Sequence, residues 1–397
     1  MTDPNSLEPA NHDAGDADDA GELRERLALL RDSAAHYAGQ DAHLKRSRAL
    51  RGEQPGYDKA VWAELAGLGW LGALIPESQG GLGLGCADMA VISEAMGRAL
   101  FPEPVTASVV LAGGAILYGD NEALKQALLP VLAGGTLVPA LAWREHVQDC
   151  DPLQVDMLAE PVAAGLRLSG TKVLVVGGIG ADGYVVSARA GDGLVLCWVR
   201  AGTAGSRVAA EQLPDGRPVA TLILDGVQVP AADILARGEV AARALMRAYD
   251  EALIMTSAEL LGLSTRVLEI TVDYLKTRVQ FGRAIGSFQA LQHQAANLYI
   301  QQRLCRHALD EAVMVLQDPA IAADERGAWA SRVKARCSDA SLKITRGAVQ
   351  MHGAMGFADE CDVGLYLKRA VTLSAWLGGA VIHRRRYARL ALKEVVA

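Results

Sequence analysis

The sequence predicts an α+β protein in which a helical N-terminal domain, a middle β domain and a C-terminal helical bundle follow one another. Apolar residues recur at helical spacing before about residue 135 and again after about residue 237. Between those points the chain forms short runs rich in β-branched side chains, bounded by glycine or polar turns. A chain of 397 residues also exceeds one ordinary core, so we expect more than one domain.

Residues 1–21 are predicted to be an acidic tail without fixed structure. They are rich in Pro, Gly, Asn and Asp and almost free of large apolar side chains, so they cannot bury enough surface to become ordered. Helical spacing begins with Leu23, Leu27 and Leu30 and is interrupted by turn-forming segments such as PESQGGLGLG. We therefore expect a helical N-terminal domain over residues 22–135.

The segment 136–236 is predicted to be the β domain. Its short runs, among them KVLVVGG at 172–178 and GLVLCWV at 193–199, follow one another about every ten residues. This spacing suits antiparallel strands in a barrel or a sandwich.

The segment 237–397 is predicted to be a four-helix bundle. The helical period returns in long pieces, one of them marked by Leu253, Leu260 and Leu268, and no proline follows Pro319 to interrupt them. Four or more helices of this length are expected to pack as a bundle.

Charge and composition exclude several classes of protein. The net charge is -7 and no run of lysine and arginine is dense enough to reverse it, which argues against a nucleic-acid partner. The six cysteines contain no C-x-x-C pair and the eight histidines show no metal-ligand spacing, so we expect a reduced, cytoplasmic protein without a metal. No apolar run reaches about 18 residues, and a secretion signal is also lacking, so no membrane span is expected.

The stretch TRVQFGRAIGSFQALQHQ, at 277–294, places two of only four phenylalanines around a glycine-containing turn. It is either a loop that joins two packed helices or a ligand site at their junction. Together with WAELAGLGWLGALIPESQGGLGLG at 62–85, AVQMHGAMGF at 348–357 and the α, β, α order, it resembles the flavin-dependent acyl-CoA dehydrogenases. The resemblance covers the chain from about residue 22 to its end.

The resemblance implies that FAD binds between a bundle helix, the β domain and the C-terminal helices of a neighbouring subunit, usually in a tetramer. Arg278 matches the arginine that contacts the FAD diphosphate across the subunit interface, a role that suits its planar, permanently charged fork. Phe281 and Phe288 would pack near the adenine. The alternatives are plain helix packing for the phenylalanines and a surface charge for Arg278.

Four further residues belong to the cofactor site that the resemblance implies. Gln280 lies inside the Arg-x-Gln-Phe-Gly element, and Gln289 and Gln350 would hydrogen-bond the polar edges of FAD. Gly353 would let the backbone approach the diphosphate without a side chain in the way.

The resemblance also implies an activity, the removal of two hydrogens across the α and β carbons of an acyl-CoA thioester to give the 2-enoyl-CoA. A carboxylate takes the α proton, the β hydrogen leaves as hydride to the flavin, and electron-transfer flavoprotein is the expected electron acceptor. The protein must position that base in a water-poor pocket, where desolvation raises its pKa towards neutrality.

The usual glutamate base of the family is missing. In most members it precedes Gly-Thr in the last domain, where this chain has Leu377, and in a minority it lies at the position of Ala252. Of three nearby acids, Asp250 matches an aspartate that touches the pantetheine arm of CoA, and Glu251 is the best candidate base, although one helical step turns a side chain by about 100°. Glu259 is too far along the helix to serve the same carbon. The alternative for all three is solvated charge on a helix face.

The β domain departs from the family pattern as well. The segment AWREHVQDCD keeps only Glu145 of the usual Thr-Glu-Pro-Gly element, and the strand Lys172–Val176 lacks the usual tryptophan and threonine that meet the flavin. The elements that serve the diphosphate side of FAD are therefore better preserved than those that meet its ring and the thioester.

This mixture resembles the small subunits of two-component acyl-CoA dehydrogenases, such as pimeloyl-CoA dehydrogenase. The resemblance leaves a homo-oligomer with Glu251 as its base and a heterotetramer with a second acyl-CoA dehydrogenase chain both open. A third interpretation is a non-catalytic partner subunit that contributes Arg278 and Gln350 across the interface, and a fourth is a flavin monooxygenase of the same fold.

Overall fold

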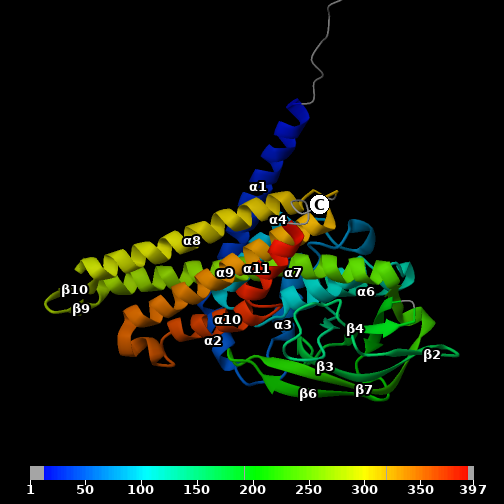
Figure 1. Ribbon diagram of the computed structural model, residues 1–397. Coiled ribbons are helices and arrows are strands. Elements are labelled where there is room, and N and C mark those ends of the chain that lie inside the picture. Colours follow the sequence, from blue (N-terminus) through cyan, green and yellow to red (C-terminus); the bar gives the residue numbers. More distant parts are fainter. Residues whose placement is uncertain (1–12, 192, 319, 392–397) are drawn as a thin grey trace, which may run out of the picture.

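A computed structural model describes residues 13–191, 193–318 and 320–391, and leaves aside the side chains of 13–20 and 41–43. Helices precede and follow two small sheets along the chain, and the sheets lie together on one side of the molecule (Figure 1). The α+β class with helical N- and C-terminal domains and a middle sheet domain is therefore confirmed.

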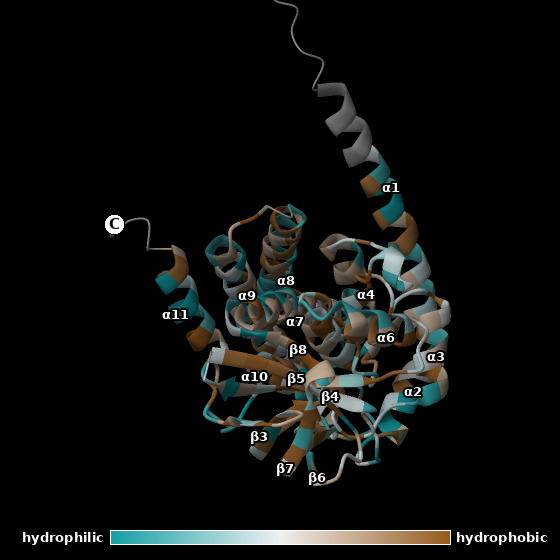
Figure 2. Cartoon of the chain, turned by 90° about the vertical axis from the view of Figure 1, so that its right-hand side faces the viewer, coloured by the Kyte–Doolittle hydropathy of each residue, from teal (hydrophilic) through white to brown (hydrophobic). Residues whose placement is uncertain are grey.

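The N-terminal domain is helical, as its apolar spacing predicts. Its first helix begins inside the segment predicted to be a tail, and residues 1–12 of that segment lie outside the described residues. Figure 2 shows this helix running away from the body of the molecule. The helices are α1 (Asp13–Ala38), α2 (Asp41–Ala49), α3 (Lys59–Gly67), α4 (Cys86–Ala99), α5 (Gly114–Leu117) and α6 (Glu122–Ala133), with a short turn η1 (Glu77–Gln79) and a π-helical stretch η2 (Thr106–Gly113).

The middle domain is a sandwich of two four-stranded sheets that do not close into a barrel. Pairing is antiparallel except between the first and fourth strands, which run parallel with Pro139 opposite Gly183, so the fully antiparallel prediction is wrong at this edge. The inner faces share a core that includes Leu168, Val186 and Leu222. One sheet holds β1 (Pro139–Ala142), β4 (Gly183–Ala190), β5 (Gly193–Arg200) and β8 (Ile234–Arg237), and the other holds β2 (Ala159–Val162), β3 (Gly165–Val176), β7 (Pro218–Pro230) and β6 (Ser206–Gln212), with a turn η3 (Ala231–Asp233) between β7 and β8.

The C-terminal domain is built around one helix of 40 residues, α7 (Gly238–Thr277), which packs against its own domain and against α4. Two glycines allow the close approach to α4. A Cβ on Gly97 would lie 2.2 Å from the backbone oxygen of Glu259, and one on Gly262 would lie 2.0 Å from that of Glu94. The remaining elements are the hairpin β9 (Val279–Gln280) and β10 (Arg283–Ala284), η4 (Ile285–Ser287), α8 (Gln289–Leu316), α9 (Ala323–His352), η5 (Gly353–Phe357), α10 (Val363–Ala375) and α11 (Ala380–Ala391).

Candidate active site and cofactor-binding region

The stretch that carries the family resemblance forms a hairpin at one end of the bundle, where α7 and α8 meet (Figure 1). The turn is made by Phe281 and Gly282, whose φ angles are 52° and 77°, as tight hairpin turns require. The rings of Phe281 and Phe288 meet edge to face with 6.1 Å between centroids, and the Arg283 guanidinium lies 4.1 Å from the centroid of Phe288. This arrangement suits both a packed connection between two helices and a ligand site at their junction.

The residues predicted to contact FAD come together at this end of the bundle. Tyr274 and His352 stack with 4.2 Å between centroids, which places the end of α9 beside the last turn of α7. Phe281 is 90% exposed. The other predicted polar contacts are exposed as well, and within the described part of the chain their side chains form no hydrogen bond: Arg278, Gln280, Gln289 and Gln350.

Gly353 ends α9 with a φ of 61° and has open space where a Cβ would lie. Its backbone can therefore be approached closely, as the diphosphate of FAD would require. The geometry of this end of the bundle fits the polar, adenine-bearing part of FAD.

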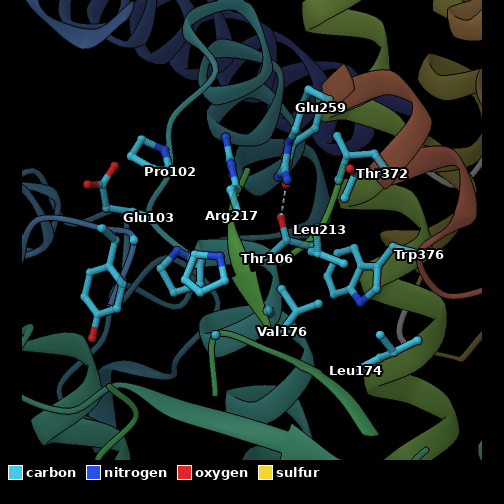
Figure 3. Close-up of a pocket in the computed structure, with 18 of the residues that line it drawn as sticks. Pro102, Glu103, Thr106, Leu174, Val176, Leu213, Arg217, Glu259, Thr372 and Trp376 are labelled. Atoms are coloured by element: carbon cyan, nitrogen blue, oxygen red, sulfur yellow. Dashed lines mark hydrogen bonds and ion pairs between the residues drawn. The ribbon is translucent and has the colours of Figure 1, made fainter. Parts of the chain in front are cut away.

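A first cavity of about 170 Å³ lies where the N-terminal domain, the sandwich and α10 meet (Figure 3). The register of β3 and β7 shifts between Lys172 and Val175, and Leu174 in this irregularity has a φ of 52°. The shift places Leu174 in the cavity wall, opposite residues of the bundle. Its lining includes Pro102, Glu103, Thr106, Arg144, Leu174, Val176, Leu213, Arg217, Glu259, Arg369 and Trp376.

Glu259 belongs to the charged wall of the first cavity. Its carboxylate accepts a hydrogen bond of 2.6 Å from the Thr106 hydroxyl and one of 2.9 Å from Arg369, which also binds Asp215 at 3.0 Å. Arg217 donates to the backbone oxygen of Leu100 at 3.0 Å, and burial lowers its pKa to about 10.

A second cavity, of about 770 Å³, lies between α7, α9, α11 and the segment 148–154. Asp250 lines it and forms ion pairs with Arg386 at 2.7 Å and Arg326 at 3.6 Å. Burial raises the pKa of Asp250, and the two guanidinium groups oppose that rise. The residue predicted to meet the pantetheine arm therefore does line a cavity, but its carboxylate is already paired.

Glu251, the predicted base, faces the N-terminal domain. Tyr118 donates to its two oxygens at 2.7 and 2.9 Å, and Arg247 donates at 3.2 Å. Burial raises the pKa of Glu251, whereas Tyr118 and Arg247 lower it. Glu251 is not among the described residues that line either cavity.

Solvated charge on a helix face was the alternative for the three acids of α7, and the structure shows it to be wrong. Asp250 and Glu259 are buried, and the Glu251 side chain is only 13% exposed. Each carboxylate is paired with at least one arginine. Helical periodicity alone does not reveal the elements that cover each face.

Leu377, which the family resemblance places at the position of the usual base, is fully buried with a φ of 59°. Its backbone oxygen accepts hydrogen bonds from the Tyr249 hydroxyl and, at 2.9 Å, from His383 Nε2. Burial, with the nearby Lys334 charge, lowers the pKa of His383 to about 3, so this histidine is neutral at physiological pH.

Lys334 also contacts the turn around Leu377. Its buried ammonium group donates to the backbone oxygens of Leu373, Ser374 and Gly378 at 3.0 to 3.2 Å. Burial lowers the pKa of Lys334 to about 7. The turn around Leu377 is thus held by three side chains from three helices.

Several residues of the two cavities were missed from the sequence. Arg144 lies in the segment AWREHVQDCD, whose departure from the family pattern was a signal that could have found it. Thr106, Arg217 and Arg369 gave no signal, because their partners lie far away in the sequence. The same holds for Lys334, which lines neither cavity.

Comparison with known proteins identifies the family. Residues 24–136 match the model described as acyl-CoA dehydrogenase, N-terminal domain, and residues 239–392 match acyl-CoA dehydrogenase, C-terminal domain. The acyl-CoA dehydrogenase IpdE2 of Mycobacterium tuberculosis is 31% identical over 353 residues, which span 87% of this chain and 91% of that protein. The chain therefore belongs to the acyl-CoA dehydrogenase family.

Solved structures share the whole architecture. A single-residue variant of the Tcur3481-Tcur3483 steroid ACAD superposes with a TM-score of 0.84 at 31% identity, covering 94% of this chain and 100% of that chain. The ChsE4-ChsE5 complex from Mycobacterium tuberculosis gives 0.81 at 29% identity, covering 93% and 97%. PigA with FAD and proline, at 20% identity, a TM-score of 0.84 and coverage of 98% and 100%, shows the fold alone.

Proposed function

We propose that this chain is one of two unlike subunits of an FAD-dependent acyl-CoA dehydrogenase, and that the second chain supplies the base. The supporting observation is that the acids near the expected reaction centre are already paired with other side chains. Asp250 and Glu259 are paired with arginines, Glu251 faces Tyr118, and the usual position is Leu377. A base needs an oxygen that is open to the substrate.

Two structural neighbours support the heteromeric assembly, because each is named for two chains, ChsE4-ChsE5 and Tcur3481-Tcur3483. The second of these is named a steroid ACAD, so a CoA thioester of a steroid side chain is the first substrate to test. Electron-transfer flavoprotein is the electron acceptor in this proposal.

In the assembled enzyme, FAD would accept the β hydrogen as hydride. This chain would hold the polar part of the cofactor from one end of the bundle. Arg278 would pair with the diphosphate through its planar fork, Gln280, Gln289 and Gln350 would bond the polar edges, and Phe281 would lie against the adenine.

An exposed apolar patch on α8 suits a contact with the second chain. Tyr299, Ile300 and Leu304, here named the α8 patch, are 56%, 51% and 49% exposed. Together with the exposed Phe281 at the end of the same helix pair, they form the type of surface that subunit contacts cover.

A self-sufficient enzyme with Glu251 as its base is the second candidate. The observation in its favour is that burial raises the pKa of Glu251, as a base working near neutral pH requires. In that case the carboxylate would have to leave Tyr118 and turn towards a cavity.

The proposal is tested by producing the chain alone and together with an acyl-CoA dehydrogenase chain encoded beside it, and by measuring bound FAD per chain. We expect bound FAD only in the co-purified complex. One FAD per chain in the protein produced alone would instead support the self-sufficient enzyme.

Arg278→Ala in the complex tests the cofactor contact. Because a charge-assisted hydrogen bond is lost, we expect FAD to bind at least about tenfold more weakly. The matched control is Arg243→Ala, which removes an exposed arginine elsewhere on α7. Equal FAD affinity in the two variants would contradict the assignment.

A further inference from the structure

Two buried cysteines meet where α8 packs against α9. Cys305 lies on α8 and is 3% exposed, and Cys337 lies on α9 and is fully buried. The Cys305 sulfur accepts a hydrogen bond from the Cys337 thiol, and its own thiol donates to the backbone oxygen of Arg336 at 3.8 Å. Both thiols are free, and the proposed function uses neither of them.

The pair lies close to the surface of the bundle. Gln301 on α8 and Arg336 on α9 are half-buried, and the Arg336 guanidinium donates to Gln301 Oε1 at 2.8 Å. Leu304, which precedes Cys305, is 49% exposed. Hydrogen peroxide is little larger than water, so it needs only a small local opening to reach the Cys305 sulfur.

The surroundings make the two thiols unequal. The hydrogen bond from Cys337 lowers the pKa of Cys305 against the effect of burial, and the Arg336 guanidinium acts in the same direction. The same contact, together with burial, raises the pKa of Cys337. Because the thiolate and not the thiol is the nucleophile, we expect Cys305 to react first. A second thiol beside a reactive one allows the first oxidation product to go on to a disulfide.

We propose that Cys305 and Cys337 form a modification site at which hydrogen peroxide, a two-electron oxidant, joins α8 to α9 through a disulfide bond. Cys305 is the attacking cysteine and Cys337 is the one that closes the bond. The site goes beyond the proposed function and requires neither FAD nor the second chain.

The reaction takes place in two steps. The Cys305 thiolate attacks one oxygen of hydrogen peroxide, the O–O bond breaks, and the other oxygen leaves as hydroxide, which becomes water with the proton that the thiol released. The Cys337 sulfur then attacks the sulfenic acid on Cys305, the S–O bond breaks, and the hydroxide leaves as water with the Cys337 proton. In total, two thiols and one peroxide give one disulfide and two waters, and the two sulfurs lose two electrons to the peroxide.

Peptide mapping of the full chain tests the site. The reduced, folded chain is treated with hydrogen peroxide, its remaining free thiols are blocked with N-ethylmaleimide, and it is digested with trypsin. Cleavage after arginine and lysine places Cys305 in the peptide 304–306 and Cys337 in the peptide 337–343. We expect both peptides in one species, two hydrogens lighter than their sum, which dithiothreitol separates. Peptides that stay unlinked after peroxide treatment overturn the proposal.

Cys197 is the matched control within the same chain, because it is equally buried, in the core of the sandwich. Burial raises its pKa to about 12. Since one pKa unit changes the fraction of thiolate tenfold, we expect peroxide to consume the Cys305 thiol at least about tenfold faster than the Cys197 thiol. Equal rates would mean that both cysteines react only after unfolding, which contradicts a site in the native protein.

Serine variants test the order of the two steps. In Cys337→Ser the hydroxyl still donates to Cys305, so we expect the reaction to stop at the sulfenic acid, which dimedone traps on Cys305. In Cys305→Ser we expect no dimedone adduct on Cys337. Equal adducts on the two cysteines would refute the assigned roles. The peptide map of the unmodified chain decides whether the bond forms even if a variant does not fold.

Thermal unfolding shows whether the bond fits the native packing. A disulfide between helices that are already packed constrains the unfolded chain, so we expect the oxidised chain to unfold a few degrees higher than the reduced chain. Peroxide should give no such rise in Cys305→Ser. A lower unfolding temperature of the oxidised chain would show that the helices must separate before the bond forms, and the proposal would be wrong.

These tests are independent of the proposed function, since they use neither FAD nor a second chain. If the disulfide forms but the chain never associates with another subunit, only the proposed function fails. If the flavin complex forms but the two peptides stay unlinked, only the cysteine site fails.

Discussion

Lys334 shows how the turn around Leu377 is held in place without an acid. The ammonium group has no carboxylate partner among the described residues and is bound by three backbone oxygens and the Ser338 hydroxyl. Burial therefore dominates and lowers the pKa to about 7. The stability of the turn therefore depends on whether Lys334 is protonated.

The free energy of unfolding is expected to depend on pH through Lys334. Lysine in an unfolded chain titrates at about pH 10.4, so between about pH 7 and that value the unfolded chain binds more protons than the folded one. Stability then rises with pH, by at most about 1.4 kcal/mol per pH unit. Chemical denaturation between about pH 7 and about pH 9 should show this rise in the unmodified chain and a smaller one in Lys334→Met. Parallel profiles would contradict the assignment.

Glu251→Gln distinguishes a structural carboxylate from a catalytic one. The change weakens the contact with Arg247 and leaves Tyr118 with a neutral partner, so we expect a loss of about 1–3 kcal/mol in stability. The dehydrogenation rate of the two-chain complex should change by less than about threefold. A drop of about a hundredfold or more, typical of a missing general base, would show that Glu251 takes the proton.

For single residues, the sequence could predict which ones share a region of the fold but not which partners they have. Periodicity shows which residues share a helix face, and the family resemblance placed Arg278 and Gln350, which the structure brings to one end of the bundle. Neither periodicity nor the resemblance reveals which distant residues pair with a charged side chain. Glu259 is bonded by Thr106 and Arg369, which lie 153 and 110 residues away in the chain.

At the scale of elements, the contact between α4 and α7 determines where Glu259 lies. The backbones approach so closely that Gly97 and Gly262 have no space for a side chain. This contact couples the N-terminal domain to the bundle and brings Glu259 to the first cavity.

Gly262→Ala should destabilise the protein, although alanine is the better helix former. Its Cβ would lie 2.0 Å from the backbone oxygen of Glu94, so α4 and α7 must separate, at a cost of about 1–3 kcal/mol or more. Gly67→Ala is the control, because nothing lies within 4 Å of that position in α3 and the change should be neutral or stabilising by up to about 1 kcal/mol. Similar unfolding temperatures for the two variants would refute this account of the contact.

The hairpin also illustrates what the sequence could predict of an element. The stretch 277–294 predicted a glycine turn between helices, and the turn lies at Phe281 and Gly282. The start of the first helix was not predicted, because composition alone assigned that part of the chain to the tail.

At the scale of the whole molecule, the α, β, α order was predictable because hydrophobic periodicity changes twice along the chain. The parallel pairing of β1 with β4 was not, since it joins strands that are far apart in the sequence and leaves no local signal. Within the described part of the chain, no helix is both long and apolar enough to cross a membrane.

The assembly should depend on the α8 patch. Ile300→Glu places a charge in the middle of this apolar surface, so we expect the subunits to associate at least tenfold more weakly, about 1.4 kcal/mol. Met314→Glu is the control, because Met314 is 58% exposed near the other end of α8. Light scattering after size-exclusion chromatography measures the mass of both variants. An unchanged complex in Ile300→Glu would place the interface elsewhere.

The central claim is that this chain does not carry out the dehydrogenation alone. Anaerobic titration with a steroid side-chain CoA thioester, followed by the visible absorbance of the flavin, tests it most directly. With FAD added, we expect the chain alone to show no bleaching and the two-chain complex to bleach fully. Bleaching by the chain alone, abolished by Glu251→Gln, would contradict the claim.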